Sequence, residues 1–206
     1  MSRKNLSTKN NYKSNMAVVS QNWLDVLIPF SYEYNKRFSG SELSRLLNLP
    51  QRSVSRILLD LAKKGILQFE DKGKNKFYYF DLLDERSFGL LRVVENYKSF
   101  KFSKNSLLWK DLSKLLSFGT VVLFGSQVKG YSTESSDIDL VIFSRNNEKL
   151  KNVLRSLPKI QAQVVSFEIF EKKVFEKDVL ALEIMKSHVV FGDFENFFNL
   201  CRRQYG

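Results

Sequence analysis

Two short apolar runs rich in β-branched residues constrain the fold of this chain more than any other feature. They are TVVLFGS (residues 120–126) and DIDLVIFS (residues 137–144). Runs of this length and composition predict two short buried strands. Side chains two positions apart on a strand point to the same face. Asp137 and Asp139 are therefore expected side by side at the start of the second strand, with Ile138 and Leu140 in the core.

The residues around these strands predict a site for a metal and a phosphate. Two carboxylates held close together repel each other unless a cation lies between them, and hard oxygen ligands suit Mg²⁺. Gly125, at the end of the first run, allows the backbone to approach a phosphate closely. Ser126 then offers a hydroxyl and an N–H at the start of the following helix. We expect one element to hold phosphates while the other holds the metal that bridges them.

The complete spacing is Gly125-Ser126, three residues, Gly130, five residues, and Ser136-Asp137-Ile138-Asp139-Leu140. It resembles the signature of the minimal nucleotidyltransferases, relatives of kanamycin nucleotidyltransferase and of the DNA polymerase β superfamily. The resemblance covers about residues 105 to 200.

The resemblance implies a role for each matching position. Asp137 and Asp139 would be the catalytic residues, holding two magnesium ions for attack on the α-phosphate of ATP or another nucleoside triphosphate. The nucleotide-binding positions would be Gly125, Ser126, Lys129, Gly130 and Ser136. Many relatives carry arginine where this chain has Lys129. The Lys129 ammonium either steers phosphate without bidentate geometry or is a solvated charge on the helix.

The family's third carboxylate, on a later strand, has no acidic counterpart here. The expected strand is in IQAQVVSFEIF (160–170), where the matching residues are glutamines. Gln163 is the favoured replacement and Gln161 the second choice. A glutamine oxygen ligates a metal but carries no charge and is no base. Glu168 would serve only in a different strand register, and a surface charge at a strand end is its alternative role.

The amino-terminal third has the pattern of three helices and a hairpin. Apolar residues recur at helical intervals from Gln21 to Phe38, with Pro29 expected to shorten or kink this helix. Ser41 is the expected N-cap of a second helix that ends near Asn48 to Pro50. A third helix begins near Gln51 and is capped by Gly65. ILQFE and KFYYF then flank DKGKN, which is a hairpin signal.

This arrangement resembles a winged helix-turn-helix over roughly residues 20 to 82. In that family the second helix of the pair enters the major groove and the wing lies along the backbone. By resemblance, the DNA-binding residues on the helix would be Gln51, Arg52, Ser53, Ser55 and Arg56, and those on the wing Lys72, Lys74 and Lys76. The alternative is a protein-interaction winged helix whose outer charges are a solvated face.

Composition limits which partners and which other kinds of site this chain can have. A net charge of +11 suits a polyanionic partner, although it also serves solubility. The single cysteine, Cys201, excludes an internal disulfide, and the single histidine, His188, excludes histidine clusters. The amino terminus is polar and basic without an apolar core, so we expect a cytoplasmic protein with no membrane partner.

The expected architecture is α+β: an amino-terminal winged helix-turn-helix followed by a nucleotidyltransferase-type mixed β-sheet flanked by helices. The expected division of the chain is a disordered basic arm (1–19), the winged helix (20–82), a helical connector (83–104) and the transferase domain (105–206). The arm either touches phosphates or is a frayed terminus.

Two functions fit these observations. The first is a Mg²⁺-dependent transferase that places a nucleoside monophosphate on a hydroxyl. By resemblance, it would be an antitoxin acting on a helical toxin of the HEPN class, with double-stranded DNA as a second partner. The second is a transcriptional regulator whose transferase fold has lost turnover and senses a nucleotide or binds a protein. The intact phosphate and metal elements favour the first function, and the missing carboxylate favours the second.

Overall fold

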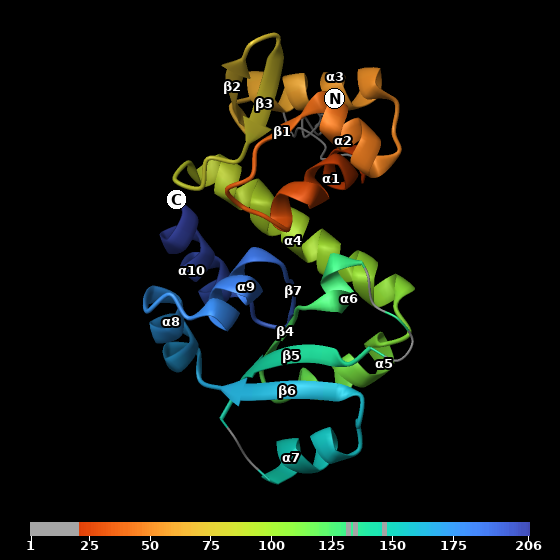
Figure 1. Cartoon of the computed structure of the whole chain (residues 1–206), viewed down its shortest axis with the longest axis vertical. Helices are drawn as coiled ribbons and strands as arrows, with labels where there is room; N and C mark the ends of the chain where they lie inside the picture. Colours follow the sequence, from red (N-terminus) through yellow and green to blue (C-terminus); the bar gives the residue numbers. More distant parts are fainter. Residues whose placement is uncertain (1–20, 131–132, 134–135, 146–147) are drawn as a thin grey trace, which may run out of the picture.

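The structure is a computed structural model that describes residues 21–130, 133, 136–145 and 148–206. The basic arm expected at residues 1–19 lies outside the described residues. Figure 1 shows an amino-terminal unit of helices with a small sheet, a long helix beneath it, and a second sheet surrounded by helices.

The amino-terminal unit combines short helices with a three-stranded antiparallel sheet. Pro29 lies in a 3₁₀ turn that follows the first helix, which is shortened as the proline predicted, and Phe38 is already in a strand. The strand order is β1-β3-β2, and β2 and β3 form the expected hairpin. The elements are α1 (Gln21–Leu27), η1 (Ile28–Ser31), β1 (Phe38–Ser39), α2 (Gly40–Leu47), α3 (Gln51–Lys63), β2 (Gln68–Lys72) and β3 (Asn75–Tyr79).

The start of α2 corrects the expected cap. Ser39, rather than Ser41, is the N-cap, because its side chain accepts from the Glu42 N–H while the Glu42 carboxylate accepts from the Ser39 N–H. This capping box follows the S-x-x-E pattern, which the sequence contains at this point. The expected ends are confirmed: Asn48 is the left-handed C-cap of α2, and Gly65 is left-handed just after α3.

A single helix, α4 (Glu85–Asn105), follows the hairpin and runs beneath the amino-terminal unit to the second sheet (Figure 1). The Asp84 carboxylate caps it by accepting from the backbone N–H groups of Arg86 and Ser87. The stretch that the sequence assigned to a connector is therefore mostly one long helix. Two short turns, α5 (Trp109–Leu112) and η2 (Ser113–Leu115), lead into the sheet.

The second sheet is mixed, with the strand order β6-β5-β4-β7. β5 and β6 run parallel, while β4 is antiparallel to both β5 and β7. Its strands are β4 (Thr120–Leu123), β5 (Ile138–Phe143), β6 (Ile160–Val165) and β7 (Val189–Phe191). The helices around it are α6 (Ser126–Lys129), α7 (Glu148–Arg155), α8 (Phe167–Phe175), α9 (Val179–Lys186) and α10 (Glu195–Tyr205).

Alternate residues of the sheet pack into two apolar clusters. Val122, Val141 and Val190 face α4, α8, α9 and α10, and this cluster continues without interruption into the amino-terminal unit. Leu123 and Leu140 face the opposite layer, which contains α5 and α7. The two units therefore share one core across α4, which favours a fixed junction over a hinged one.

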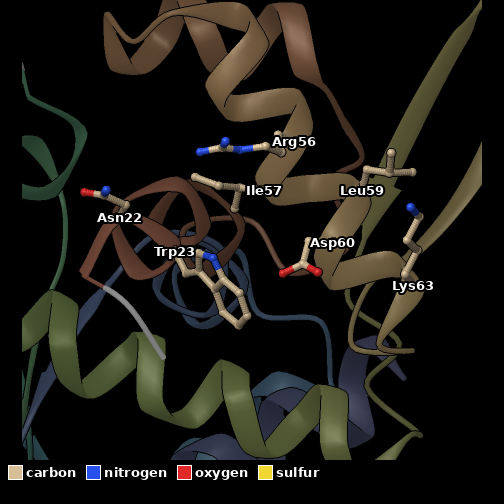
Figure 2. Close-up of a pocket in the computed structure, with 7 residues that line it drawn as sticks. All are labelled: Asn22, Trp23, Arg56, Ile57, Leu59, Asp60 and Lys63. Carbon is tan, nitrogen blue, oxygen red and sulfur yellow. The ribbon is translucent and has the colours of Figure 1, made fainter. Parts of the chain in front are cut away.

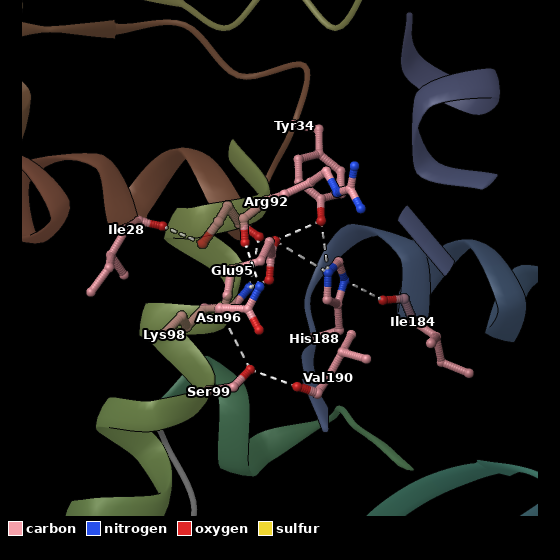
Figure 3. A network of polar contacts seen from close by, with 11 residues as sticks. Ile28, Tyr34, Arg92, Glu95, Asn96, Lys98, Ser99, Ile184, His188 and Val190 are labelled. Carbon is pink, nitrogen blue, oxygen red and sulfur yellow. Dashed lines mark hydrogen bonds and ion pairs between the residues drawn. The ribbon is translucent and has the colours of Figure 1, made fainter. Parts of the chain in front are cut away.

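Buried polar groups also join the two units (Figure 3). The Tyr34 hydroxyl donates to Glu95 Oε1 at 2.6 Å and lies 3.1 Å from His188 Nε2. The Lys98 ammonium lies 2.8 Å from Glu95 Oε2 as an ion pair and donates to the Ser31 carbonyl at 2.9 Å. Because His188 is 0% exposed and bonded inside this network, its role is structural.

None of the helices in the described part of the chain combines the length and the apolar character needed to cross a bilayer.

Candidate nucleotide site and amino-terminal basic face

The turn after β4 depends on Gly125. This residue has φ +72° and ψ −148°, a conformation that residues with a side chain rarely adopt. A Cβ added at Gly125 would also contact the Asp139 carboxylate, so a side chain at this position would have to displace that carboxylate. The backbone N–H of Phe124 donates to the Asp139 carbonyl at 3.1 Å. The turn and the aspartate are thus packed directly against each other.

Asp137 and Asp139 lie at the start of β5, as the alternation of the sequence predicted. Asp137 is exposed just before the strand, whereas Asp139 is partly buried between the strand and the Gly125 turn. Burial raises the pKa of Asp139, and the nearby charges of Asp137 and Glu183 raise it further. The site therefore concentrates negative charge that a cation would relieve.

The register of β6 decides between the two glutamines. Gln161 is level with Asp139, and its Nε2 donates to Asp137 Oδ2 at 2.6 Å. Gln163 is level with Val141, one step farther along the strand on the same face. The favoured choice is therefore revised: Gln161 lies beside the aspartates, where the third ligand was expected.

Glu168 is not on the strand. β6 ends at Val165, and Ser166 caps α8, which places Glu168 in the first turn of that helix. Because β5 and β6 are parallel, α8 begins at the end of the sheet opposite to the one that carries Asp137. A change of register therefore cannot bring Glu168 to the site, and its charge belongs to the helix start.

Lys129 and Ser136 complete the positions expected from the motif. Lys129, the last residue of α6, forms an ion pair with Glu183 of α9 at 2.5 Å. Gly130 follows with φ +80° as the left-handed cap of α6. The Ser136 hydroxyl accepts from the Thr133 N–H at 2.8 Å and so holds the loop before Asp137. The sequence pattern did not single out Glu183, because its proximity to this site depends on how α9 packs.

The residues present fit a divalent cation in part. Asp137 and Asp139 supply two carboxylates, and the Gln161 amide offers a neutral oxygen if the side chain rotates about its last bond. Within the described ranges, His, Cys, Asp and Glu side chains form no group of three suited to a metal ion. Any metal here would therefore depend on the aspartate pair, with phosphate oxygens or water as further ligands.

Comparison with protein families identifies this region. Residues 106–199 match the family model described as "Nucleotidyltransferase domain". The match supports a nucleotidyltransferase domain in this part of the chain. The match begins at the turn before α5 and ends within α10, so it contains the whole second sheet and every position discussed above. No curated protein and no solved structure gives a significant match to the chain.

The match supports a general nucleotidyltransferase function, and domains of this kind generally use nucleoside triphosphates and divalent metals. The amino-terminal unit lies outside the matched residues.

The outer face of α3, in the amino-terminal unit, carries the residues that the sequence proposed for DNA. Val54, Leu58 and Leu61 of this helix are buried. The opposite face at the helix start is exposed and consists of Gln51, Arg52, Ser53, Ser55 and Arg56. The helical periodicity therefore predicted the solvent face correctly.

The hairpin is less basic than its sequence suggested. Lys72 pairs with Glu70 at 2.7 Å, and Lys76 pairs with Asp71 at 2.9 Å. Lys74, at the turn between the strands, makes no ion pair with any described residue. Among the three wing lysines, Lys74 thus has the charge most available to a phosphate.

A groove between α1 and α3 adjoins this face (Figure 2). It has a volume of about 390 Å³ and is bordered by Trp23, Ile57 and Arg56 among other residues. The Arg56 side chain extends toward α1 across the groove (Figure 2). Arg52, one turn earlier, does not border the groove, so the two arginines have different surroundings.

Proposed function

We propose that this protein transfers a nucleoside monophosphate from a magnesium-bound nucleoside triphosphate to a hydroxyl acceptor. The acceptor oxygen bonds to the α-phosphate as the bond to the β-phosphate breaks, and pyrophosphate leaves. The observation that carries the proposal is the packing of the Gly125 turn against the Asp139 carboxylate. This arrangement brings a backbone that a phosphate can approach next to two carboxylates suited to a metal. The family match over residues 106–199 supports the same class of reaction.

Each residue then has a defined task. The Gly125 turn, Ser126 and Gly130 receive the triphosphate, and Lys129 at the end of α6 adds a positive charge beside them. Asp137 and Asp139 hold the cation, which when bound neutralises phosphate charge and lowers the pKa of the attacking hydroxyl. The Gln161 side chain orients Asp137 through its hydrogen bond.

The direct test is transfer of label from α-labelled ATP to an acceptor in the presence of Mg²⁺. The acceptors to compare are the protein itself, an RNA pool and a small helical protein of the HEPN class, which the family resemblance points to. The proposal expects label on one acceptor from the wild type and none from Asp137→Asn. Label that persists in Asp137→Asn would contradict it.

A second candidate function is a nucleotide-sensing regulator without turnover. The specific observation in its favour is Gln161, which lies level with Asp139 and donates to Asp137 instead of supplying a third negative charge. This function keeps nucleotide binding but not transfer. Binding of Mg-ATP by calorimetry without label transfer to any acceptor would support it.

We further propose that the amino-terminal unit is a winged helix that binds double-stranded DNA through the start of α3 and the tip of the β2–β3 hairpin. The order of a helix, the short strand β1, two further helices and a hairpin supports this, as do the exposed cations Arg52 and Lys74. The net charge of +11 agrees with a polyanionic partner.

The test is a gel-shift titration at several salt concentrations. Arg52→Ala should weaken binding by about 1–3 kcal/mol if it contacts a base, or lower the salt slope by about 1 if it contacts a phosphate. Arg155→Ala, on the exposed surface of α7, is the matched control. Equal affinities and equal slopes for both variants would exclude Arg52 from the interface.

A further inference from the structure

A pocket of about 590 Å³ lies where the amino-terminal unit meets the transferase domain. Its volume is within the range of pockets that bind small ligands. Tyr32 and Glu33 form the wall that belongs to the amino-terminal unit, and α9 and α6 form the rest. The residues that border it are Tyr32, Glu33, Lys129, Val179, Leu182, Glu183, Lys186 and Ser187.

Two of these residues connect the pocket to the phosphate and metal site. Lys129 ends the helix that starts at the Gly125-Ser126 turn, and it borders the pocket. Glu183 borders the pocket and lies close enough to Asp139 to contribute to the raised pKa of that carboxyl. A ligand whose phosphates lie at Gly125 would thus have the pocket beside it.

The chemistry of the walls suits a base and a sugar rather than more phosphate. Tyr32 offers an aromatic ring, and Val179 and Leu182 offer apolar surface from α9. The carboxylates of Glu33 and Glu183 accept hydrogen bonds, which sugar hydroxyls and exocyclic amines donate. The two cations, Lys129 and Lys186, are balanced by these two acids, so the pocket has no strong preference for an anion.

The Tyr32 ring is held in place by the junction. The Lys98 ammonium lies 4.8 Å from the centre of that ring and also donates to the carbonyl of Ser31, the preceding residue. Lys98 is itself fixed by Glu95 within the buried network. The ring is therefore a preorganised wall, which reduces the entropy cost of binding a flat ligand.

We infer that this junction pocket binds the nucleoside part of the triphosphate, with Tyr32 as the aromatic wall. The inference rests on the proposed function, because it takes the phosphates to lie at the Gly125 turn. It means that a residue outside the matched domain contributes to nucleotide recognition. The nucleotide then contacts both units of the protein at once.

Calorimetry with two ligands distinguishes the binding contribution of the nucleoside from that of the phosphates. Wild type should bind Mg-ATP more tightly than Mg-tripolyphosphate. Tyr32→Ala should weaken Mg-ATP about tenfold, as expected for the loss of one stacked base, and leave Mg-tripolyphosphate unchanged. Tyr32→Phe keeps the ring and should bind both ligands like the wild type. Equal loss of ATP affinity in Tyr32→Phe and Tyr32→Ala, or none in either, would overturn the inference.

A second measurement uses the wild-type protein and does not depend on the fold of a variant. An ATP analogue with a photoreactive azide on the adenine should crosslink to Tyr32 or to α9, as read by mass spectrometry. Crosslinks confined to other elements would overturn the inference even if Mg-tripolyphosphate binds. If neither Mg-ATP nor Mg-tripolyphosphate binds the wild type, the proposed function itself fails.

Discussion

The buried ion pair between Lys98 and Glu95 should make the junction sensitive to the loss of either charge. Both side chains are almost fully buried, at 3% and 1% exposure. Lys98→Met removes the partner of Glu95 Oε2 and the donor to the Ser31 carbonyl. Breaking a buried pair by removing one partner costs about 3–5 kcal/mol of unfolding free energy, because the remaining charge stays buried without its ion-pair partner. We expect a loss in this range.

The assay is urea unfolding of the wild type, Lys98→Met, Glu95→Gln and the double variant, followed by circular dichroism. The double variant removes both charges, and the amide oxygen that Glu95→Gln introduces still accepts from the Tyr34 hydroxyl. Since uncharged replacements of a buried pair are often near neutral, the double variant should be more stable than Lys98→Met alone. A loss below about 1 kcal/mol in Lys98→Met, or a double variant that shows the plain sum of both losses, would refute this reasoning.

Two further predictions concern pH and the third-ligand position. Burial and the charge of Lys98 lower the pKa of His188 in the folded protein below its unfolded value of about 6.5. Between these two pKa values the unfolded chain binds more protons than the folded one. Stability should therefore fall as the pH drops below about 6.5. His188→Gln should flatten this slope in urea midpoints measured from pH 7 to pH 5, and an unchanged slope would assign it to other groups. Gln161→Glu should raise the transfer rate by about 100-fold, because it places a carboxylate beside Asp137. Gln163→Glu, on the same face one step away, is the matched control, and an equal gain in both variants would contradict the register argument.

Local pattern predicted the elements that carry the candidate site. The alternation around Asp137 and Asp139 determines which side chains share a face, and the β-branched runs determine where the strands lie. The turn at Gly125 was expected from a glycine at the end of a strand. Its reason became clear only from the structure, because the Asp139 carboxylate lies where a Cβ would be.

Features that depend on register or on distant segments were harder to predict. Alternation places Gln161 and Gln163 on one face, and only the pairing of β6 with β5 shows that Gln161 is level with Asp139. Glu168 was expected on β6 or at its end, whereas Ser166 starts a helix there. The N-cap of α2 was expected at Ser41, although the S-x-x-E pattern begins two residues earlier, at Ser39.

The junction could not be predicted from sequence patterns at all. The Tyr34 hydroxyl contacts His188, which is 154 residues away in the sequence. Lys98 donates a hydrogen bond to the Ser31 carbonyl from a different helix. A lysine and a glutamate three residues apart on a helix usually indicate a solvated pair. Here α4 runs between two apolar layers, so the same spacing produces a buried pair.

The most direct test of the account is the Mg²⁺ dependence of ATP binding in the wild type and in Asp139→Asn, measured by calorimetry. The wild type should bind ATP tightly only with Mg²⁺. Asp139→Asn should bind ATP weakly even with Mg²⁺, because one of the two carboxylates that hold the metal is gone. Asp139→Asn should also be at least as stable as the wild type without metal, because the folded-state pKa of Asp139 is raised and the charge is unfavourable there. A stable Asp139→Asn variant that binds Mg-ATP as tightly as the wild type would contradict the assignment of this site.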